Sequence, residues 1–148
     1  MKISELTNAP EWLKNAKVTN EDVEIVDGVV IWHDGVWYDG TWYDGDWCGG
    51  TWCGGIWRGG TWCGGTWYDG TWYDGDWYDG TWCGGTWYDG NWHDGAWHYG
   101  IWHHGIWHDG TWRGGTWYDG TWYDGSWYDG TWCGGDWRGG CVYAKTHP

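Results

Sequence analysis

The sequence predicts an all-β protein, a parallel β-solenoid, and three observations lead to that prediction. Residues 31–140 are 22 consecutive copies of the five-residue unit x-Trp-x-x-Gly, without an interruption. Trp is second and Gly fifth in every copy, whereas the other three positions vary. Thr and Tyr, which favour extended backbone, are common around each Trp, and a Gly at every fifth residue opposes a helix. A fixed short period of this kind indicates units that stack on one another.

Each unit is expected to form a short strand that ends in a bend. Side chains alternate along a strand, so Gly40 and Trp42 share one face, and Thr41 and Tyr43 share the other. Asp-Gly or Gly-Gly then supplies the corner, because Gly tolerates positive φ. Trp and Gly are therefore expected to face a crowded interior. The predicted core consists of Trp32, Trp37, Trp42, Trp47, Trp52, Trp57, Trp62, Trp67, Trp72, Trp77, Trp82, Trp87, Trp92, Trp97, Trp102, Trp107, Trp112, Trp117, Trp122, Trp127, Trp132 and Trp137.

The register Gly-x-Trp-x-x, as in Gly40-Thr41-Trp42-Tyr43-Asp44, is similar to that of the pentapeptide-repeat family. Units of that family carry a small residue and, two positions later, Leu or Phe, both pointing inward. The resemblance covers residues 31–140 and implies a right-handed quadrilateral β-helix with about four pentapeptides per coil. Here Gly replaces the usual Ala and Trp replaces Leu or Phe, a pair of changes that roughly preserves core volume.

Four units per coil would place residues 20 apart on adjacent coils. The 22 units would then form a rod about 26 Å long, at ~4.8 Å per coil. One stack of aromatic rings would contain Trp32, Trp52, Trp72, Trp92, Trp112 and Trp132.

A weaker similarity links the segment from Tyr38 to Gly45 with the core of MORN repeats, Tyr-x-Gly-x-Trp-x-x-Gly. MORN units are much longer β-hairpins, whereas the period of five never breaks in this chain. The solenoid is therefore the preferred interpretation.

The flanking segments are expected to cap the solenoid, because an exposed terminal coil is a sheet edge that invites pairing. Residues 1–30 form the predicted N-terminal cap, with a short helix around Pro10 and a hairpin whose turn is Asp27-Gly28. Residues 31–140 form the solenoid. Residues 141–148 form a thin C-terminal cap that keeps the phase but has Val142 where Trp belongs. The thinness of this cap leaves end-to-end stacking open.

Composition and charge exclude several classes of function. The chain has 148 residues, a net charge of −14 and a pI near 4.4, so direct binding of nucleic acid or anionic membranes is not expected. No apolar run is long enough for a membrane span, and the segment from Met1 to Leu6 lacks the apolar core of a signal peptide. We expect a cytoplasmic or virus-encoded protein rather than a secreted one, with its six Cys reduced.

Several surface residues are candidates for a site. Clustered histidines suggest a metal site, but four faces would point them in different directions, and no metal or other cofactor is expected. Cys63 and Cys83, 20 residues apart, would be neighbours on adjacent coils, although free thiols are the preferred interpretation. The histidines are His93, His98, His103, His104 and His108, and a ladder of threonines would contain Thr41, Thr61, Thr81 and Thr121.

The third and fourth positions of the unit vary together. All eight copies with Cys or Arg third have Gly fourth, and all 14 copies with Tyr or His third have Asp, Tyr or His fourth. Repeat duplication with linked codon changes explains this coupling without selection on the side chains. A steric requirement, in which a bulky third residue accompanies Asp, is the alternative.

No nucleophile–base pair or isolated carboxylate pair departs from the repeat, so we expect a protein that is not an enzyme, with no catalytic or cofactor-binding residues. The first hypothesis is a structural or self-assembling solenoid, a rigid scaffold that forms homo-oligomers, end-to-end assemblies or filaments. The alternatives are an acidic module that mimics DNA, as the family resemblance implies, and a carbohydrate-binding module that uses exposed Tyr. The acidic surface would in that first alternative bind a protein partner.

Overall fold

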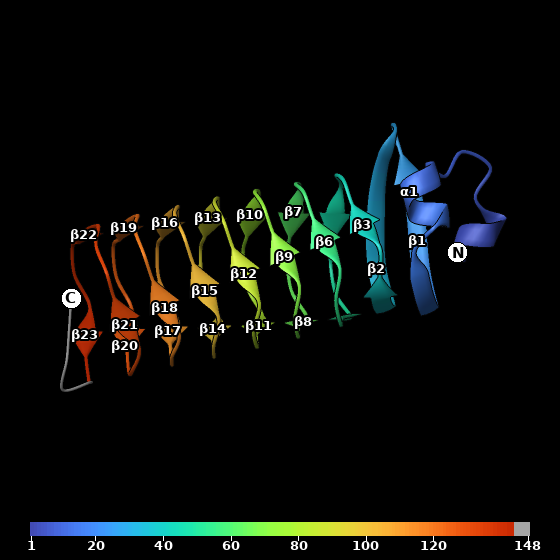
Figure 1. Ribbon diagram of the computed structural model, residues 1–148. Helices are drawn as coiled ribbons and strands as arrows, with labels where there is room; N and C mark the ends of the chain where they lie inside the picture. The colour runs from blue at the N-terminus through green and yellow to red at the C-terminus, as the bar shows by residue number, and fades with distance from the viewer. Residues whose placement is uncertain (144–148) are drawn as a thin grey trace.

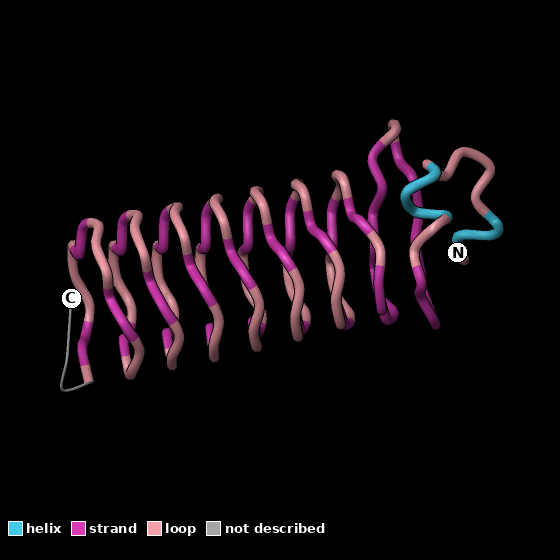
Figure 2. Tube along the Cα trace, in the orientation of Figure 1, coloured by secondary structure: helices cyan, strands magenta, loops and turns pink. Residues whose placement is uncertain are grey.

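The computed structural model describes residues 1–143, and the chain forms a straight rod of stacked coils with its N-terminal segment at one end (Figure 1). The sequence prediction of an all-β parallel solenoid with a buried Trp core is confirmed. Short strands follow one another around each coil and are joined by bends (Figure 2). Each repeat strand contains two residues, the first-position residue and the Trp.

The coil contains three pentapeptides, so the expected four-sided coil is wrong. Thr41 pairs in parallel with Ile56, and Trp42 with Trp57, a register of 15 residues that continues along the whole rod. Each coil therefore has three faces, and the 22 units make about seven coils. At ~4.8 Å per coil the rod is about 34 Å long, not 26 Å.

Three columns of strands make the three faces. The first face contains the first part of β2 (Val29–Asp39), then β4 (Asp46–Trp47), β7 (Thr61–Trp62), β10 (Asp76–Trp77), β13 (Asn91–Trp92), β16 (Ile106–Trp107), β19 (Thr121–Trp122) and β22 (Asp136–Trp137). The second contains the rest of β2, then β5 (Thr51–Trp52), β8 (Thr66–Trp67), β11 (Thr81–Trp82), β14 (Ala96–Trp97), β17 (Thr111–Trp112), β20 (Ser126–Trp127) and β23 (Cys141–Val142). The third contains β3 (Thr41–Trp42), β6 (Ile56–Trp57), β9 (Thr71–Trp72), β12 (Thr86–Trp87), β15 (Ile101–Trp102), β18 (Thr116–Trp117) and β21 (Thr131–Trp132).

The size and contact geometry of indole account for three sides. Around one coil, Trp42 meets Trp47 edge to face with ring centroids 5.9 Å apart and an interplanar angle of 79°. Trp47 meets Trp52 in the same way at 5.8 Å and 74°. Trp52 meets Trp57 likewise, and Trp57 stacks on Trp42, so three edge-to-face steps lead once around the core and fill its centre, in an arrangement that aromatic rings prefer.

Along the rod the indoles form three ladders with a step of 15 residues. Trp82 stacks between Trp67 and Trp97, with centroids 4.8 and 4.7 Å away and planes within 6°. Twenty of the 22 repeat Trp have no exposed surface, and Trp132 and Trp137 in the last coil are partly buried. The expected stack of Trp residues 20 apart is wrong, because such residues lie on different faces.

Backbone hydrogen bonds join each coil to the next. The N–H of Arg58 donates to the carbonyl of Trp42 at 2.8 Å, and the N–H of Ile56 donates to the carbonyl of Gly40 at 3.0 Å. The same two bonds recur in every unit along the rod, between residues 16 apart. The ladder satisfies backbone groups that would otherwise be costly to bury.

The fifth-position Gly is required for a different reason from the expected inward packing. Gly60 has a φ of 108°, and a Cβ built on it would overlap the carbonyl oxygen of Gly45 in the preceding coil. The missing side chain thus points along the rod axis at the neighbouring coil. Gly is needed for the corner and for close stacking of coils, and only Trp fills the interior.

Indole N–H groups find carbonyl acceptors in part of the core. The Nε1–H of Trp97 donates to the Gly114 carbonyl at 3.1 Å, and that of Trp102 donates to the Asp119 carbonyl at 3.2 Å. Six indoles make this bond to the fourth-position carbonyl of the next coil, 17 residues ahead. Fourteen other buried Nε1 atoms have no hydrogen-bond partner in the described residues.

The N-terminal segment covers all three sides of the first coil. β1 (Lys17–Val26) runs antiparallel to β2 across the first and second faces, and the predicted hairpin at Asp27-Gly28 is confirmed. A short 3-10 helix (Ile3–Glu5) precedes α1 (Glu11–Lys14), which packs against β3. Trp12 meets Trp42 edge to face at 5.1 Å. At this end of the rod, β1 therefore pairs with the first and second faces, and α1 covers β3, the first strand of the third face.

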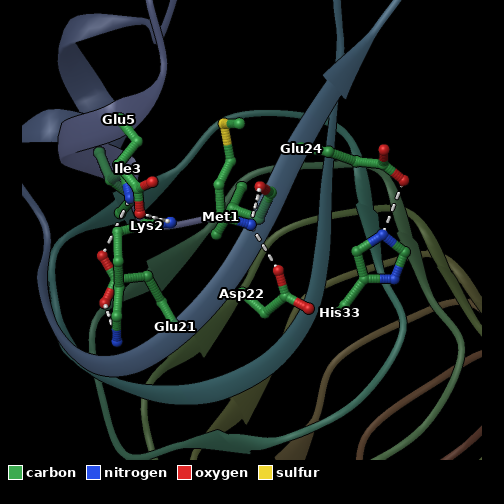
Figure 3. A network of polar contacts seen from close by, with 9 residues as sticks. Met1, Lys2, Ile3, Glu5, Glu21, Asp22, Glu24 and His33 are labelled. Carbon is green, nitrogen blue, oxygen red and sulfur yellow. Dashed lines mark hydrogen bonds and ion pairs between the residues drawn. The ribbon is translucent and has the colours of Figure 1, made fainter.

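Polar contacts fasten the N-terminal segment to β1 and β2 (Figure 3). The Met1 amino group donates to Asp22 Oδ1 at 2.6 Å, and the hydrogen bond and charge of that amine lower the pKa of Asp22. The backbone N–H of Ile3 donates to a carboxylate oxygen of Glu21 at 3.1 Å. His33 and Glu24 form a pair 2.8 Å apart across the two strands.

The other end of the rod differs. β21, β22 and β23 are the last strands of their faces, and in residues 1–143 no strand pairs beyond them. Trp132 and Trp137 are only partly buried there, and Val142 is 36% exposed. The predicted C-terminal cap of residues 141–148 lies within the description only up to Tyr143.

Candidate functional surface

Third-position side chains form three outer columns, one along each face. The first outer column contains His33, Cys48, Cys63, Tyr78, His93, His108, Tyr123 and Arg138. The second contains Tyr38, Cys53, Tyr68, Cys83, His98, Arg113, Tyr128 and Tyr143. The third contains Tyr43, Arg58, Tyr73, Tyr88, His103, Tyr118 and Cys133.

Rings in these columns stack on their neighbours in the next coil. Tyr73 stacks on Tyr88 with centroids 5.1 Å apart and planes 8° apart, and Tyr88 stacks on His103 at 4.7 Å. In the same column, the guanidinium of Arg58 lies 5.5 and 5.4 Å from the ring centroids of Tyr43 and Tyr73. Rings stacked on both sides, such as Tyr88, thus present their edges to solvent.

Four of the five candidate metal ligands are spread over the three outer columns, and the fifth, His104, lies at a fourth position. His93 and His108 are neighbours in the first outer column, stacked at 4.8 Å between Tyr78 and Tyr123. His98 and His103 lie in the second and third columns. Among residues 1–143, no three His, Cys, Asp or Glu side chains are placed to hold a metal ion together.

His104 occupies a fourth position and serves the backbone. Its Nδ1 accepts a hydrogen bond from the N–H of Gly105 at 2.6 Å. Fourth-position Asp residues do the same: Asp79 Oδ1 accepts from the N–H of Gly80 at 2.8 Å. All 12 fourth-position Asp make this bond. Their carboxylates are part of the corners, as the Asp-Gly units predict, and the structure identifies the N–H of the following Gly as their partner.

In the stacked histidine pair, the pKa of His108 is shifted from its ordinary value. Burial lowers the pKa of His108, the charge on His93 lowers it further, and Asp76 opposes the change. His108 therefore resists protonation as long as the column is intact.

The thiols fall into a different arrangement from the expected one. Cys63 and Cys83 lie in different columns, so the expected proximity of this pair is wrong. The three-unit coil instead places Cys63 directly beside Cys48, because Trp47 and Trp62 are paired residues. Cys53 and Cys83 share the second column but are separated by Tyr68. All six cysteines are free thiols.

The threonine ladder is likewise rearranged by the three-sided coil. Thr41 belongs to the third face, Thr81 to the second, and Thr61 and Thr121 to the first, so the expected row does not exist. The row on the second face contains Thr51, Thr66, Thr81, Ala96, Thr111 and Ser126.

Surface hollows lie where the N-terminal cap meets the first coils. One is lined by residues that include Pro10, Trp12 and Val30. Another is lined by Glu11, Trp12, Asn15, Gly40, Thr41 and Tyr43. Both are lined by residues of the cap and of the first coils, and Tyr43 of the third outer column lines the second.

No protein-family model, curated protein or solved structure matches this chain. The five-residue period and the parallel solenoid are consistent with a pentapeptide-repeat-like fold. No hairpin joins successive repeat units in residues 31–143, in contrast to MORN repeats. Neither helix in residues 1–143 is long or apolar enough to span a membrane.

Proposed function

We propose that the chain is a non-enzymatic structural protein, a rigid rod that acts as a scaffold. The observation that carries this proposal is the uninterrupted Trp ladder, in which 20 indoles have no exposed surface and each coil repeats the contacts of the last. Close-packed aromatic rings resist bending, since any tilt between coils opens gaps in all three ladders.

The acidic surface has a structural explanation that weakens the DNA-mimic alternative. Residues 31–140 contain 15 Asp and three Arg, a net charge of −12. Over the same length of about 34 Å, duplex DNA carries about 20 charges at one per ~1.7 Å. Twelve of the 15 Asp accept a hydrogen bond at a corner, so their presence follows from the fold. Charge also keeps a Trp-rich rod soluble.

The carbohydrate-binding alternative has little geometric support. Sugar rings bind aromatic side chains through their faces. Neighbouring rings cover both faces of Tyr88 and one face each of Tyr73 and Tyr118.

The same proposal includes self-assembly, for which one end of the rod is available. β1 and α1 cover the first coil, whereas no strand in residues 1–143 pairs beyond the last coil, where Trp137 and Val142 lie. A filament built by head-to-tail stacking needs two uncovered ends. We therefore expect two copies to meet at their last coils, where each buries the other's partly exposed Trp.

Sedimentation over a range of protein concentrations tests this proposal. The wild-type chain is expected to form dimers that dissociate on dilution, and Val142→Lys is expected to remain monomeric because it adds charge to the contact. The control Thr86→Lys adds the same charge to the side of the rod and leaves the dimer intact. Monomers at every concentration, or long filaments in electron micrographs, would rule out pairing at the last coil.

The scaffold itself is tested separately by small-angle X-ray scattering of Val142→Lys. A rigid rod of about seven coils gives the scattering of one straight particle about 34 Å long plus its cap. A flexible or collapsed chain would contradict the scaffold function, whatever the oligomeric state. Inhibition of a type II topoisomerase in a DNA-relaxation assay would favour the DNA-mimic alternative instead.

A further inference from the structure

Cys48 and Cys63 are neighbours on consecutive coils of the first outer column. Their strands, β4 and β7, pair in parallel with Trp47 opposite Trp62. The N–H of Cys63 donates to the carbonyl of Trp47 at 2.7 Å, which holds the two backbones in this register. Both side chains are exposed.

The spacing between neighbouring strands suits a disulfide. Paired residues on adjacent strands have Cα atoms about 4.8 Å apart. Disulfides are found with Cα separations of about 4.4–6.8 Å. The two thiols lie close enough for each to influence the pKa of the other.

No other pair among the six cysteines has this placement. Cys53 and Cys83 lie two coils apart in one column, at about 9.6 Å, beyond the reach of a disulfide. Cys133 belongs to the third column, and Cys141 is at a first position on the second face. The fold therefore singles out one pair.

We propose that Cys48 and Cys63 form a modification site, a reversible disulfide that joins two consecutive coils when the protein meets hydrogen peroxide. The thiolate of one cysteine attacks the peroxide oxygen, giving a sulfenic acid and releasing water after proton transfer. The sulfur of the other cysteine then attacks the sulfenic sulfur and releases a second water. Two thiols lose two electrons and two protons in total, and one peroxide is reduced to two waters.

The local chemistry sets the conditions for this reaction. Burial raises the pKa of the Cys48 and Cys63 thiols, and Asp46 raises both further. Because the thiolate is the attacking form, oxidation is slow at neutral pH and accelerates as pH rises.

The consequence of the bond is a staple near the capped end. It connects β4 to β7 and encloses Arg58, an exposed residue at which trypsin cuts. A chain cut after Arg58 would then stay in one covalent piece, so oxidation protects the first coils against loss by proteolysis. Reduction by a small thiol reverses the bond.

Two variants of the full chain, each with two cysteines, provide the test. The first keeps Cys48 and Cys63 and replaces Cys53, Cys83, Cys133 and Cys141 with Ser. The second keeps Cys53 and Cys83 and replaces Cys48, Cys63, Cys133 and Cys141 with Ser. Each is treated with hydrogen peroxide at several pH values, blocked with an alkylating reagent and examined by intact mass spectrometry.

The first variant is expected to lose two hydrogen atoms as a monomer, faster at higher pH, and to regain them with dithiothreitol. After tryptic digestion in denaturant, residues 18–58 and 59–113 remain linked until reduction. The second variant is expected to form no internal disulfide. Equal disulfide yields in both variants, only intermolecular dimers, or oxidation of the first variant to sulfinic acid without a bond would overturn the proposal. Circular dichroism of both reduced variants verifies that each is folded.

Discussion

Trp32 and Trp47, separated by 15 residues, stack with their ring centroids 4.7 Å apart and their planes 5° apart. This contact begins the ladder of the first face and defines the coil as three pentapeptides. Because every later Trp repeats it, the contribution of one indole depends on how many rings flank it.

Replacing Trp82 with Ala is expected to lower the free energy of unfolding by about 3–5 kcal/mol, the usual cost of removing a fully buried Trp. Trp82 stacks on two indoles and meets two more edge to face. The same change at Trp137, which stacks only on Trp122 and meets Trp132, should cost less than half as much. Chemical denaturation followed by circular dichroism measures both, and equal costs would mean that ladder stacking contributes little.

Adjacent glycines in one corner should respond in opposite ways to Ala. Gly60 has positive φ and no room for a Cβ against Gly45, so Gly60→Ala should cost about 3 kcal/mol or more. A Cβ on Gly59 meets only the carbonyl oxygen of Tyr43 at 3.6 Å, and Gly59→Ala should change stability by less than about 1 kcal/mol. Denaturation midpoints of the two variants provide the comparison.

The contrast between Gly59 and Gly60 also helps to explain why the third and fourth positions of the repeat unit vary together. Fourth-position glycines would accept a Cβ at 3.1–3.7 Å from the nearest carbonyl oxygen, and Asp stands at this position in 12 copies. The backbone therefore does not require Gly there, which favours the codon explanation over the steric one. Gly59→Asp beside Arg58 should fold as well as the wild-type chain, and failure to fold would restore the steric explanation.

The corner hydrogen bond can be separated from the charge at Asp74. Its Oδ1 accepts from the N–H of Gly75 at 2.8 Å. Asp74→Ala removes the acceptor and should reduce the free energy of unfolding by about 1 kcal/mol. Asp74→Asn keeps an acceptor oxygen without the charge and should retain most of the stability. If Asn destabilises as much as Ala, the charge rather than the hydrogen bond supports the corner.

Acid should weaken the rod through His108. Its pKa is lowered in the folded chain, chiefly by burial and then by His93. The unfolded chain therefore binds the proton more readily, and stability decreases as pH falls below 6.5, the ordinary pKa of a histidine. His108→Tyr, which matches its neighbour Tyr123, should flatten the pH dependence between neutral and acidic pH.

Thermal denaturation at several pH values measures this effect. The control is His98→Tyr in the second outer column, which leaves the His93–His108 contact in place. An unchanged pH dependence in His108→Tyr would show that the stacked pair does not contribute to acid sensitivity.

The structure of the repeat unit and of the hairpin before it could be predicted from the sequence. The period of five, the buried Trp and the Asp27-Gly28 hairpin follow from local rules of strand alternation and turn chemistry. Which candidate site residues lie together depends on which of them share a face. That grouping follows from the number of units per coil, which the sequence did not reveal. Pairings made at a spacing of 20, such as Cys63 with Cys83 or Thr61 with Thr81, consequently failed together.

The invariant Trp and Gly of the repeat by themselves determined a parallel solenoid with an aromatic core, since no other arrangement buries a Trp and bends at a Gly every five residues. Only the tertiary structure decided the three-sided coil, because that number depends on how indole rings meet. Three edge-to-face steps such as Trp42 with Trp47 lead once around the core, and the fourth ring, Trp57, then stacks on Trp42. This closure places Cys48 beside Cys63 and His93 beside His108. It also packs the fifth-position Gly of each unit against the fifth-position Gly of the preceding coil.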